Sequence, residues 1–245
     1  MSSSTIIIPA RYAATRFPAK LLQDLCGKSV LQRTWEAANA AGADLVAIAT
    51  DHQEIARLAQ DFGAQVVFTS DTVQNGSDRV CEAALTLNLA DDDLVINLQG
   101  DEPLFSSSDI NLLLVRMREN QDMEMASMMH PMEDRYQFDT PGCVKVVTDA
   151  QGRALYFSRA GIPYPRNHIA HTPMMHQGIY GFRLRTLKRF VSMPPCVLEQ
   201  LESLEQLRAL YHGIAIHMVV SQDPAHPGVD TPEDLEYARK VLSQS

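Results

Sequence analysis

Residues 94–101 read Leu-Val-Ile-Asn-Leu-Gln-Gly-Asp, and this stretch decides the fold. A short, mostly apolar run that ends in a Gly-containing turn is typical of a strand buried on both faces. Open parallel sheets bind their ligands beyond the carboxyl ends of such strands. The stretch therefore predicts a central strand of a parallel sheet, with Asp101 at the end where a ligand would bind.

The sequence around this stretch alternates between strand and helix patterns. Short apolar runs predict strands, and apolar residues at helical spacing predict helices between them. The expected strands cover residues 6–8, 45–49 and 66–68, and the expected helices cover about 30–38, 53–62 and 79–89. Right-handed crossovers then give an α/β fold, a Rossmann-like doubly wound and mostly parallel sheet.

The alternation weakens after about residue 120. A β-hairpin is predicted over 144–157 and a loop or lid over the proline-rich residues 161–175; residues 125–129 are compatible with a strand. A leucine stripe predicts a helix over 198–210, a strand follows at 214–220, and a last helix starts at Thr231. We expect one domain over residues 1–245, with a small inserted β subdomain at about 130–185.

The composition of the 245 residues excludes several classes of protein. A hydrophobic fraction of 45% excludes disorder, and a net charge of −9 argues against nucleic acid or an anionic membrane as a partner. No apolar run approaches the roughly 18 residues of a membrane span, and the N-terminus has no signal-peptide pattern. Four widely spaced cysteines suit a reducing compartment, so we expect a cytoplasmic protein.

The first polar segment of interest, residues 9–20, reads Pro-Ala-Arg-Tyr-Ala-Ala-Thr-Arg-Phe-Pro-Ala-Lys and follows the first expected strand. It makes the start of this acidic chain locally basic, through Arg11, Arg16 and Lys20. Backbone amides near Ala10 and these three cations can surround a triphosphate, although the segment lacks the GxxxxGK[ST] pattern of a P-loop. Taken alone, it is equally compatible with a surface loop that carries solvated cations.

Two carboxylates supply a second signal. Asp101 ends the central strand, and Asp230 stands just before the helix that starts at Thr231. Mg²⁺ prefers one or two protein carboxylates and completes its octahedron with phosphates and water. Both aspartates are therefore candidate Mg²⁺ ligands, with helix or turn capping as the alternative for each.

These segments together resemble the sugar-nucleotide cytidylyltransferases. The likeness rests on PARxxxxRxPxK, QGDEP, ALYFSRAGIP and VDTPEDL, and runs from Ile6 to about Leu242. The resemblance implies transfer of CMP from CTP to the anomeric hydroxyl of a 2-keto sugar acid, release of pyrophosphate, a need for Mg²⁺, a homodimer and a place in lipopolysaccharide synthesis. 3-Deoxy-D-manno-octulosonate (Kdo) is the favoured acid. A sialic acid, 8-amino-Kdo, or a non-catalytic nucleotide-binding role are the alternatives.

The same resemblance implies roles for individual residues. The proposed catalytic set is Arg11, Lys20, Asp101 and Asp230, of which the two aspartates would bind the metal. The nucleotide-binding set is Ala10, Arg11, Arg16, Lys20, Gly76, Ser77, Arg79 and Gln99. The set that would bind the sugar acid is Arg159, His176, Tyr180, Glu205 and Gln206.

The sequence departs from the family pattern at three positions. Ala19 stands where the family usually has Gly, so it has either a negative φ or modest strain. Ala14 and Asn75 stand where Ser is common. No general base is assigned, because a metal bridging the hydroxyl and the α-phosphate lowers the hydroxyl pKa directly. For His176, substrate binding or hydrogen bonding is favoured over the role of a base.

Overall fold

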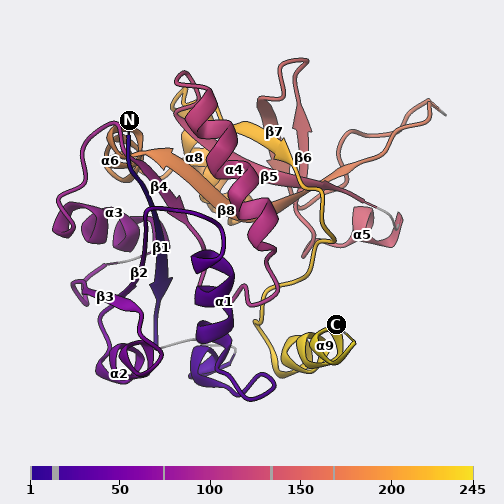
Figure 1. Ribbon diagram of the computed structural model, residues 1–245. Coiled ribbons are helices and arrows are strands. Elements are labelled where there is room, and N and C mark those ends of the chain that lie inside the picture. The colour runs from indigo at the N-terminus through magenta and orange to yellow at the C-terminus, as the bar shows by residue number, and fades with distance from the viewer. Residues whose placement is uncertain (1, 13–16, 74, 133–134, 168, 245) are drawn as a thin grey trace.

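The computed structural model describes residues 2–12, 17–73, 75–132, 135–167 and 169–244. Its strands form one sheet with the order β3-β2-β1-β4-β8-β5-β9, and β6 and β7 extend the sheet from β8 (Figure 1). The first four strands are parallel and end at the same edge. They cover Ser4–Ala10 (β1), Leu45–Thr50 (β2), Gln65–Phe68 (β3) and Leu94–Asn97 (β4). The predicted α/β fold is confirmed.

The second half of the sheet is mixed. β8 (Met174–Arg183) lies antiparallel between β4 and β5 (Met125–Pro131), and β9 (His217–Val220) is parallel to β5. The sequence patterns did not predict β8, and the strand expected from residue 214 begins only at 217. The β-hairpin is confirmed as β6 (Lys145–Thr148) and β7 (Ala154–Ser158). Because β6 also pairs with β8, this hairpin belongs to the same sheet.

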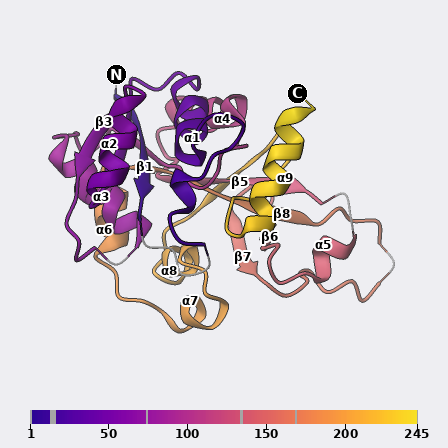
Figure 2. The ribbon, with the colours of Figure 1, turned by 90° about the horizontal axis from the view of Figure 1, so that it is seen from below.

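Helices cover both faces of the sheet (Figure 2), where two clusters of buried apolar side chains fill the interior. One cluster lies under α1 (Val30–Asn39) and α4 (Ser107–Glu119), and the other lies under α3 (Gly76–Thr86) and α6 (Leu184–Val191). The remaining helices are η1 (Lys20–Leu22), α2 (Gln53–Asp61), α5 (Arg135–Asp139), α7 (Val197–Glu202), α8 (Gln206–Tyr211) and α9 (Pro232–Ser243).

Three helix predictions meet different outcomes. The helix expected over 198–210 is wrong as a single element, because Ser203 adopts a left-handed φ of 51° and separates α7 from α8. The helix expected at 79–89 begins earlier, because Asn75 accepts a hydrogen bond from the Asp78 amide and caps it. The start of α9 is confirmed, with Thr231 as its N-cap. Among the described residues, no helix has the length and apolar character needed to cross a membrane.

Candidate active site

Three charged side chains meet beyond the carboxyl ends of β1 and β4, and we call Lys20, Asp101 and Asp230 the charged cluster. Lys20 Nζ donates hydrogen bonds to a carboxylate oxygen of Asp101 and, at 2.7 Å, to Oδ1 of Asp230. The Lys20 side chain is only 13% exposed, whereas those of Asp101 and Asp230 are 25% and 42% exposed. The ammonium therefore lies inside the cluster, and the carboxylates face outward to solvent.

Backbone contacts position the two aspartates. The Val229 amide donates to the Asp101 carbonyl at 2.8 Å, which joins the turn after β4 to the loop before α9. The carboxylate of Asp234 accepts hydrogen bonds from the amides of Asp230 and Thr231, at 3.1 and 2.9 Å. The capping box at the start of α9 thus fixes the backbone of Asp230, whose own carboxylate accepts from Lys20.

A left-handed residue presents Lys20 to the cluster. Ala19 has a φ of 53° and directly precedes η1, so the strained alternative predicted for this position is the one observed. The Leu22 amide donates to the Ala19 carbonyl at 3.0 Å, and the Leu21 side chain is buried. The backbone on both sides of Lys20 is therefore held, and its long side chain reaches from it to both carboxylates.

A third carboxyl group lies beside the two aspartates. Burial, together with the negative charges of Asp101 and Asp230, raises the pKa of Glu102 to about 8. Gly228 makes room for it, because a Cβ there would lie 2.9 Å from Glu102 Oε1. Glu102 is therefore mostly protonated at neutral pH and adds little negative charge to the charged cluster.

A second group of site residues is buried (Ser77 and Gln206) or half-buried (His176, Tyr180 and Glu205), and we call these five residues the buried polar cluster. Ser77 Oγ donates to Glu205 Oε2 at 2.8 Å. Within the described part of the chain, Glu205 Oε1 and Gln206 Nε2 are buried without a hydrogen-bond partner. Burial raises the pKa of Glu205, and burial with the Glu205 charge raises the pKa of Tyr180. Buried polar atoms without partners are costly unless a ligand satisfies them.

His176 is a neutral member of this cluster. Its Nε2 lies 2.9 Å from Ser127 Oγ, and its ring packs against Phe157 and Tyr180 with centroid distances of 5.0 and 5.4 Å. Burial lowers the pKa of His176 to about 3, so the imidazole stays uncharged at neutral pH. A group with so low a pKa is a weak base, which agrees with a hydrogen-bonding role.

The turn after β4 brings the two clusters together. A Cβ on Gly76 would lie 3.2 Å from Gln99 Nε2, which itself donates to Asn97 Oδ1 at 3.0 Å. Gln99 precedes the Gly100-Asp101 turn, and Gly76 precedes Ser77. The contact between Gly76 and Gln99 therefore joins the turn that carries Asp101 to the start of α3, which carries Ser77.

Two of the predicted arginines lie at this junction. Arg79 is buried and donates to Asp51 Oδ2 at 2.7 Å and to Thr69 Oγ1. Burial, then the charge of Arg79, lowers the pKa of Arg11, while Asp51 and Glu205 oppose this effect. The charges of Arg11 and Glu205 are therefore near enough to interact.

Arg159 points elsewhere, and two other predicted positions cannot be placed. Arg159 donates through its guanidinium to the carbonyls of Pro141, Glu202 and Ser203, toward the break between α7 and α8. None of these bonds reaches the other residues predicted to bind a sugar acid. Arg16 and Ala14 lie outside the described residues.

Comparisons with known proteins decide the family. A model of the cytidylyltransferase family matches residues 5–216. The chain belongs to the cytidylyltransferase family. It is 43% identical to 3-deoxy-manno-octulosonate cytidylyltransferase 2 of Actinobacillus pleuropneumoniae serotype 5b (strain L20), with 98% of each chain covered. It is 44% identical to the 3-deoxy-manno-octulosonate cytidylyltransferase of Cellvibrio japonicus (strain Ueda107), with 97% of each covered.

A solved structure agrees with the whole cytidylyltransferase chain. CMP:2-keto-3-deoxy-manno-octonic acid synthetase complexed with CTP matches it with a TM-score of 0.94 at 38% identity, covering 99% of both chains. The predicted resemblance, the fold and the class of enzyme, a nucleotidyltransferase, are confirmed.

The charged cluster of this cytidylyltransferase fits a small hard cation. Two partly exposed carboxylates are the donors that Mg²⁺ prefers, and Lys20 shows that a positive charge is stable between them. Among the described residues, no group of three or more His, Cys, Asp or Glu side chains has the arrangement of a metal site. The protein thus offers two carboxylates, and the other positions of an octahedron are left for phosphates and water.

Several residues for which the sequence predicted no individual role support the site. Asp51 pairs with Arg79, and Ser127 holds His176. Lys145 is completely buried, and its ammonium donates to the carbonyls of Thr140, Cys143 and Arg159 at 3.0, 2.5 and 2.6 Å. Asp51 directly follows β2, so its place at the functional edge of the sheet was the one available signal.

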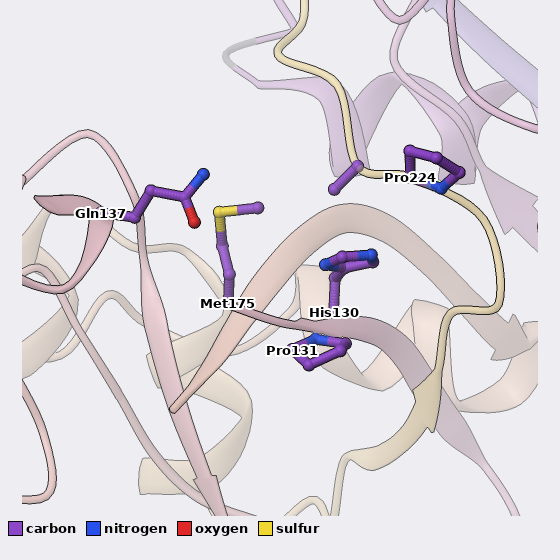
Figure 3. A pocket seen from close by; sticks show the side chains of 6 residues that line it. His130, Pro131, Gln137, Met175 and Pro224 are labelled. Atoms are coloured by element: carbon purple, nitrogen blue, oxygen red, sulfur yellow. The ribbon is translucent and has the colours of Figure 1, made fainter. Parts of the chain in front are cut away.

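A pocket of this cytidylyltransferase outside both clusters is shown in Figure 3. Side chains from β5, α5, β8 and the loop before α9 line it: His130, Pro131, Gln137, Met175, Pro224 and Ala225. No predicted site residue is among them, although Met175 directly precedes His176 on β8.

Proposed function

We propose that this cytidylyltransferase transfers CMP from CTP to the anomeric hydroxyl of Kdo and releases pyrophosphate. The hydroxyl oxygen bonds to the α-phosphorus, the bond from that phosphorus to the α–β bridging oxygen breaks, and the hydroxyl proton is lost. The observation that carries the proposal is the agreement over 97–98% of the chain, at 43–44% identity, with enzymes named for this reaction.

The nucleotide would lie against the carboxyl ends of β1 and β4. Arg11, Arg16 and Lys20 would neutralise the phosphates, and the backbone at Ala10 would approach them. Gln99 and the start of α3, with Gly76, Ser77 and Arg79, would line the nucleoside pocket. The close approach of Gly76 to Gln99 supports this assignment, since a larger residue at 76 would press against the Gln99 amide.

Four members of the buried polar cluster, His176, Tyr180, Glu205 and Gln206, would bind the sugar acid. Glu205 Oε1 and Gln206 Nε2 are ready to hydrogen-bond the hydroxyls of a ligand, and neutral His176 and Tyr180 extend the same surface. Arg159 would bind the acid's carboxylate, which requires its guanidinium to leave the carbonyls that it contacts now.

Asp101 and Asp230 would hold Mg²⁺. Bound there, the ion would neutralise phosphate charge and lower the pKa of the attacking hydroxyl. The residues of the chain position the two reactants, which supplies much of the catalysis in phosphoryl-type transfers. Accordingly, no side chain needs to act as a dedicated base, and the low pKa of His176 agrees with that.

We also propose that the chain forms a homodimer through the β-rich subdomain at about 130–185 of a single domain covering 1–245. The segment between β7 and β8 extends away from the sheet (Figures 1 and 2). It carries Tyr164 and Ile169, which are 83% and 76% exposed. Large apolar side chains on a projecting segment suit contact with a second copy. Light scattering should report a dimer, and a double substitution of Tyr164 and Ile169 to Glu should weaken it.

A pyrophosphate-release assay tests the catalytic proposal. CTP, Mg²⁺ and Kdo should give pyrophosphate and CMP-Kdo in equal amounts, and ATP, GTP or UTP should give much less. Turnover with a sialic acid or 8-amino-Kdo but not with Kdo would reassign the substrate. If no sugar acid supports turnover although CTP binds, the chain would be a non-catalytic nucleotide-binding protein.

A further inference from the structure

The Lys20 ammonium already occupies the position between the two carboxylates that would bind a metal. It donates to both Asp101 and Asp230, and its side chain is more buried than either carboxylate. An ammonium and a divalent cation cannot share this space, because like charges a few ångströms apart repel strongly. The two carboxylates are therefore neutralised by a cation that the protein itself supplies.

The local backbone favours this arrangement, because it directs the Lys20 side chain to both carboxylates. Left-handed Ala19 and buried Leu21 fix the backbone, so that rotation of the Lys20 side chain is enough to release the carboxylates.

A triphosphate would provide a competing partner for the ammonium. It carries several negative charges, and Lys20 belongs to the segment expected to surround it. We propose, on the basis of the function proposed above, that Lys20 occupies the carboxylates of the free enzyme and releases them only when CTP arrives. The free enzyme then has low affinity for Mg²⁺, and nucleotide and metal bind with strong positive coupling.

A metal titration without turnover tests this inference. Mn²⁺ replaces Mg²⁺ as the probe, and electron paramagnetic resonance measures bound and free ion in the absence of sugar acid. Free Lys20→Met should bind Mn²⁺ at least about tenfold more tightly than the free wild-type enzyme, because it leaves both carboxylates without the ammonium. Lys20→Arg keeps the positive charge, so its affinity should stay near that of the wild type.

Matched variants separate this competition from other effects. Lys28→Met removes a lysine that pairs with Glu36 at 2.7 Å away from the site, and should leave Mn²⁺ binding unchanged. Asp101→Asn should abolish the tight binding in the Lys20→Met background. With CTP present, the Mn²⁺ bound in Asp101→Asn is the amount that the nucleotide holds without this carboxylate. The wild-type enzyme with CTP should bind Mn²⁺ more tightly than that variant.

Two results would overturn the inference. One is equal affinity of free wild type and free Lys20→Met for Mn²⁺. The other is a wild-type affinity that CTP does not raise above the Asp101→Asn level, a measurement that remains decisive if Lys20→Met fails to fold. Either result alongside normal CMP-Kdo formation would refute the role of Lys20 and leave the proposed function intact. Absence of turnover with every sugar acid would refute the proposed function, and the titration would still report on Lys20.

Discussion

The charged cluster and the buried polar cluster are close in space, yet different forces hold their residues in place. Lys20, Asp101 and Asp230 are held by their opposite charges at a partly exposed surface. His176 and Glu205 are half-buried, and desolvation keeps the imidazole neutral and raises the pKa of the carboxyl group. Changes in the first cluster should therefore affect catalysis with little effect on stability, whereas changes near the second should affect both.

Metal removal gives the sharpest test of this difference. EDTA should reduce turnover below detection, because it removes the ion that the two carboxylates would hold. Excess Mg²⁺ should restore turnover. The thermal unfolding midpoint of the nucleotide-free protein should not move, since Lys20 occupies the charged cluster in that state. Turnover that persists in EDTA would refute the metal dependence.

Asp101→Asn should reduce kcat by about a thousandfold or more, because it removes one of two metal ligands at the reacting phosphate. The free energy of unfolding should change by no more than about 1 kcal/mol, as for other partly exposed positions. Asp61→Asn, at the exposed end of α2, is the matched control and should change neither quantity. Wild-type activity in Asp101→Asn would exclude this residue as a metal ligand.

Lys145→Met tests the buried side of the comparison. The substitution removes the buried ammonium that donates to the carbonyls of three half-buried residues, so we expect a loss of about 2–4 kcal/mol in the free energy of unfolding. One of these carbonyls belongs to Arg159, so the KM for the sugar acid should rise while the KM for CTP stays constant. Urea denaturation and initial rates measure these effects, with Lys28→Met as a surface control. Equal changes in both KM values would indicate general damage rather than a local one.

Glu205→Gln should change how stability depends on pH. Burial raises the pKa of Glu205 in the folded state above its unfolded value. Its contribution to stability is therefore fully present below the unfolded pKa and is lost as the pH rises through the folded pKa. The glutamine variant cannot ionise, so its stability relative to the wild type should improve as the pH rises above about 4. Urea denaturation across this range measures the difference, and parallel pH profiles would contradict it.

The first half of the fold was predictable because β1 to β4 are short apolar runs that end in turn residues. β8 was not, because it contains two glycines, which are uncommon in strands. Gly181 has a packing reason, since a Cβ there would lie 2.3 Å from Met117 Sδ on α4. Likewise, the leucine spacing across 198–210 contains no sign of the left-handed Ser203 that divides α7 from α8. Both features depend on contacts between segments far apart in the sequence.

The candidate site likewise has features that the sequence predicted and features that depend on tertiary contacts. Asp101 follows a strand and Asp230 precedes a helix, so the geometry of parallel sheets predicted that they would lie at one edge. The contact between Ser127 and His176 depends on the register of β5 against β8, which shifts between Ser127 and Met128. The direction in which the Arg159 side chain points also follows from tertiary packing, and no local pattern reports it.

The smallest predicted effect concerns Ala19, which presents Lys20 to the charged cluster. A left-handed φ costs an alanine about 1 kcal/mol, and glycine adopts it freely, so Ala19→Gly should stabilise the fold by about 0.5–1 kcal/mol. Ala40→Gly is the matched control: Ala40 has an ordinary φ of −79° at the end of α1, so glycine there should be neutral or destabilising. Turnover by Ala19→Gly should equal that of the wild type, because the left-handed backbone is kept and Lys20 stays where it is. Loss of activity in a stabilised Ala19→Gly would instead show that alanine restricts this segment for the benefit of the charged cluster.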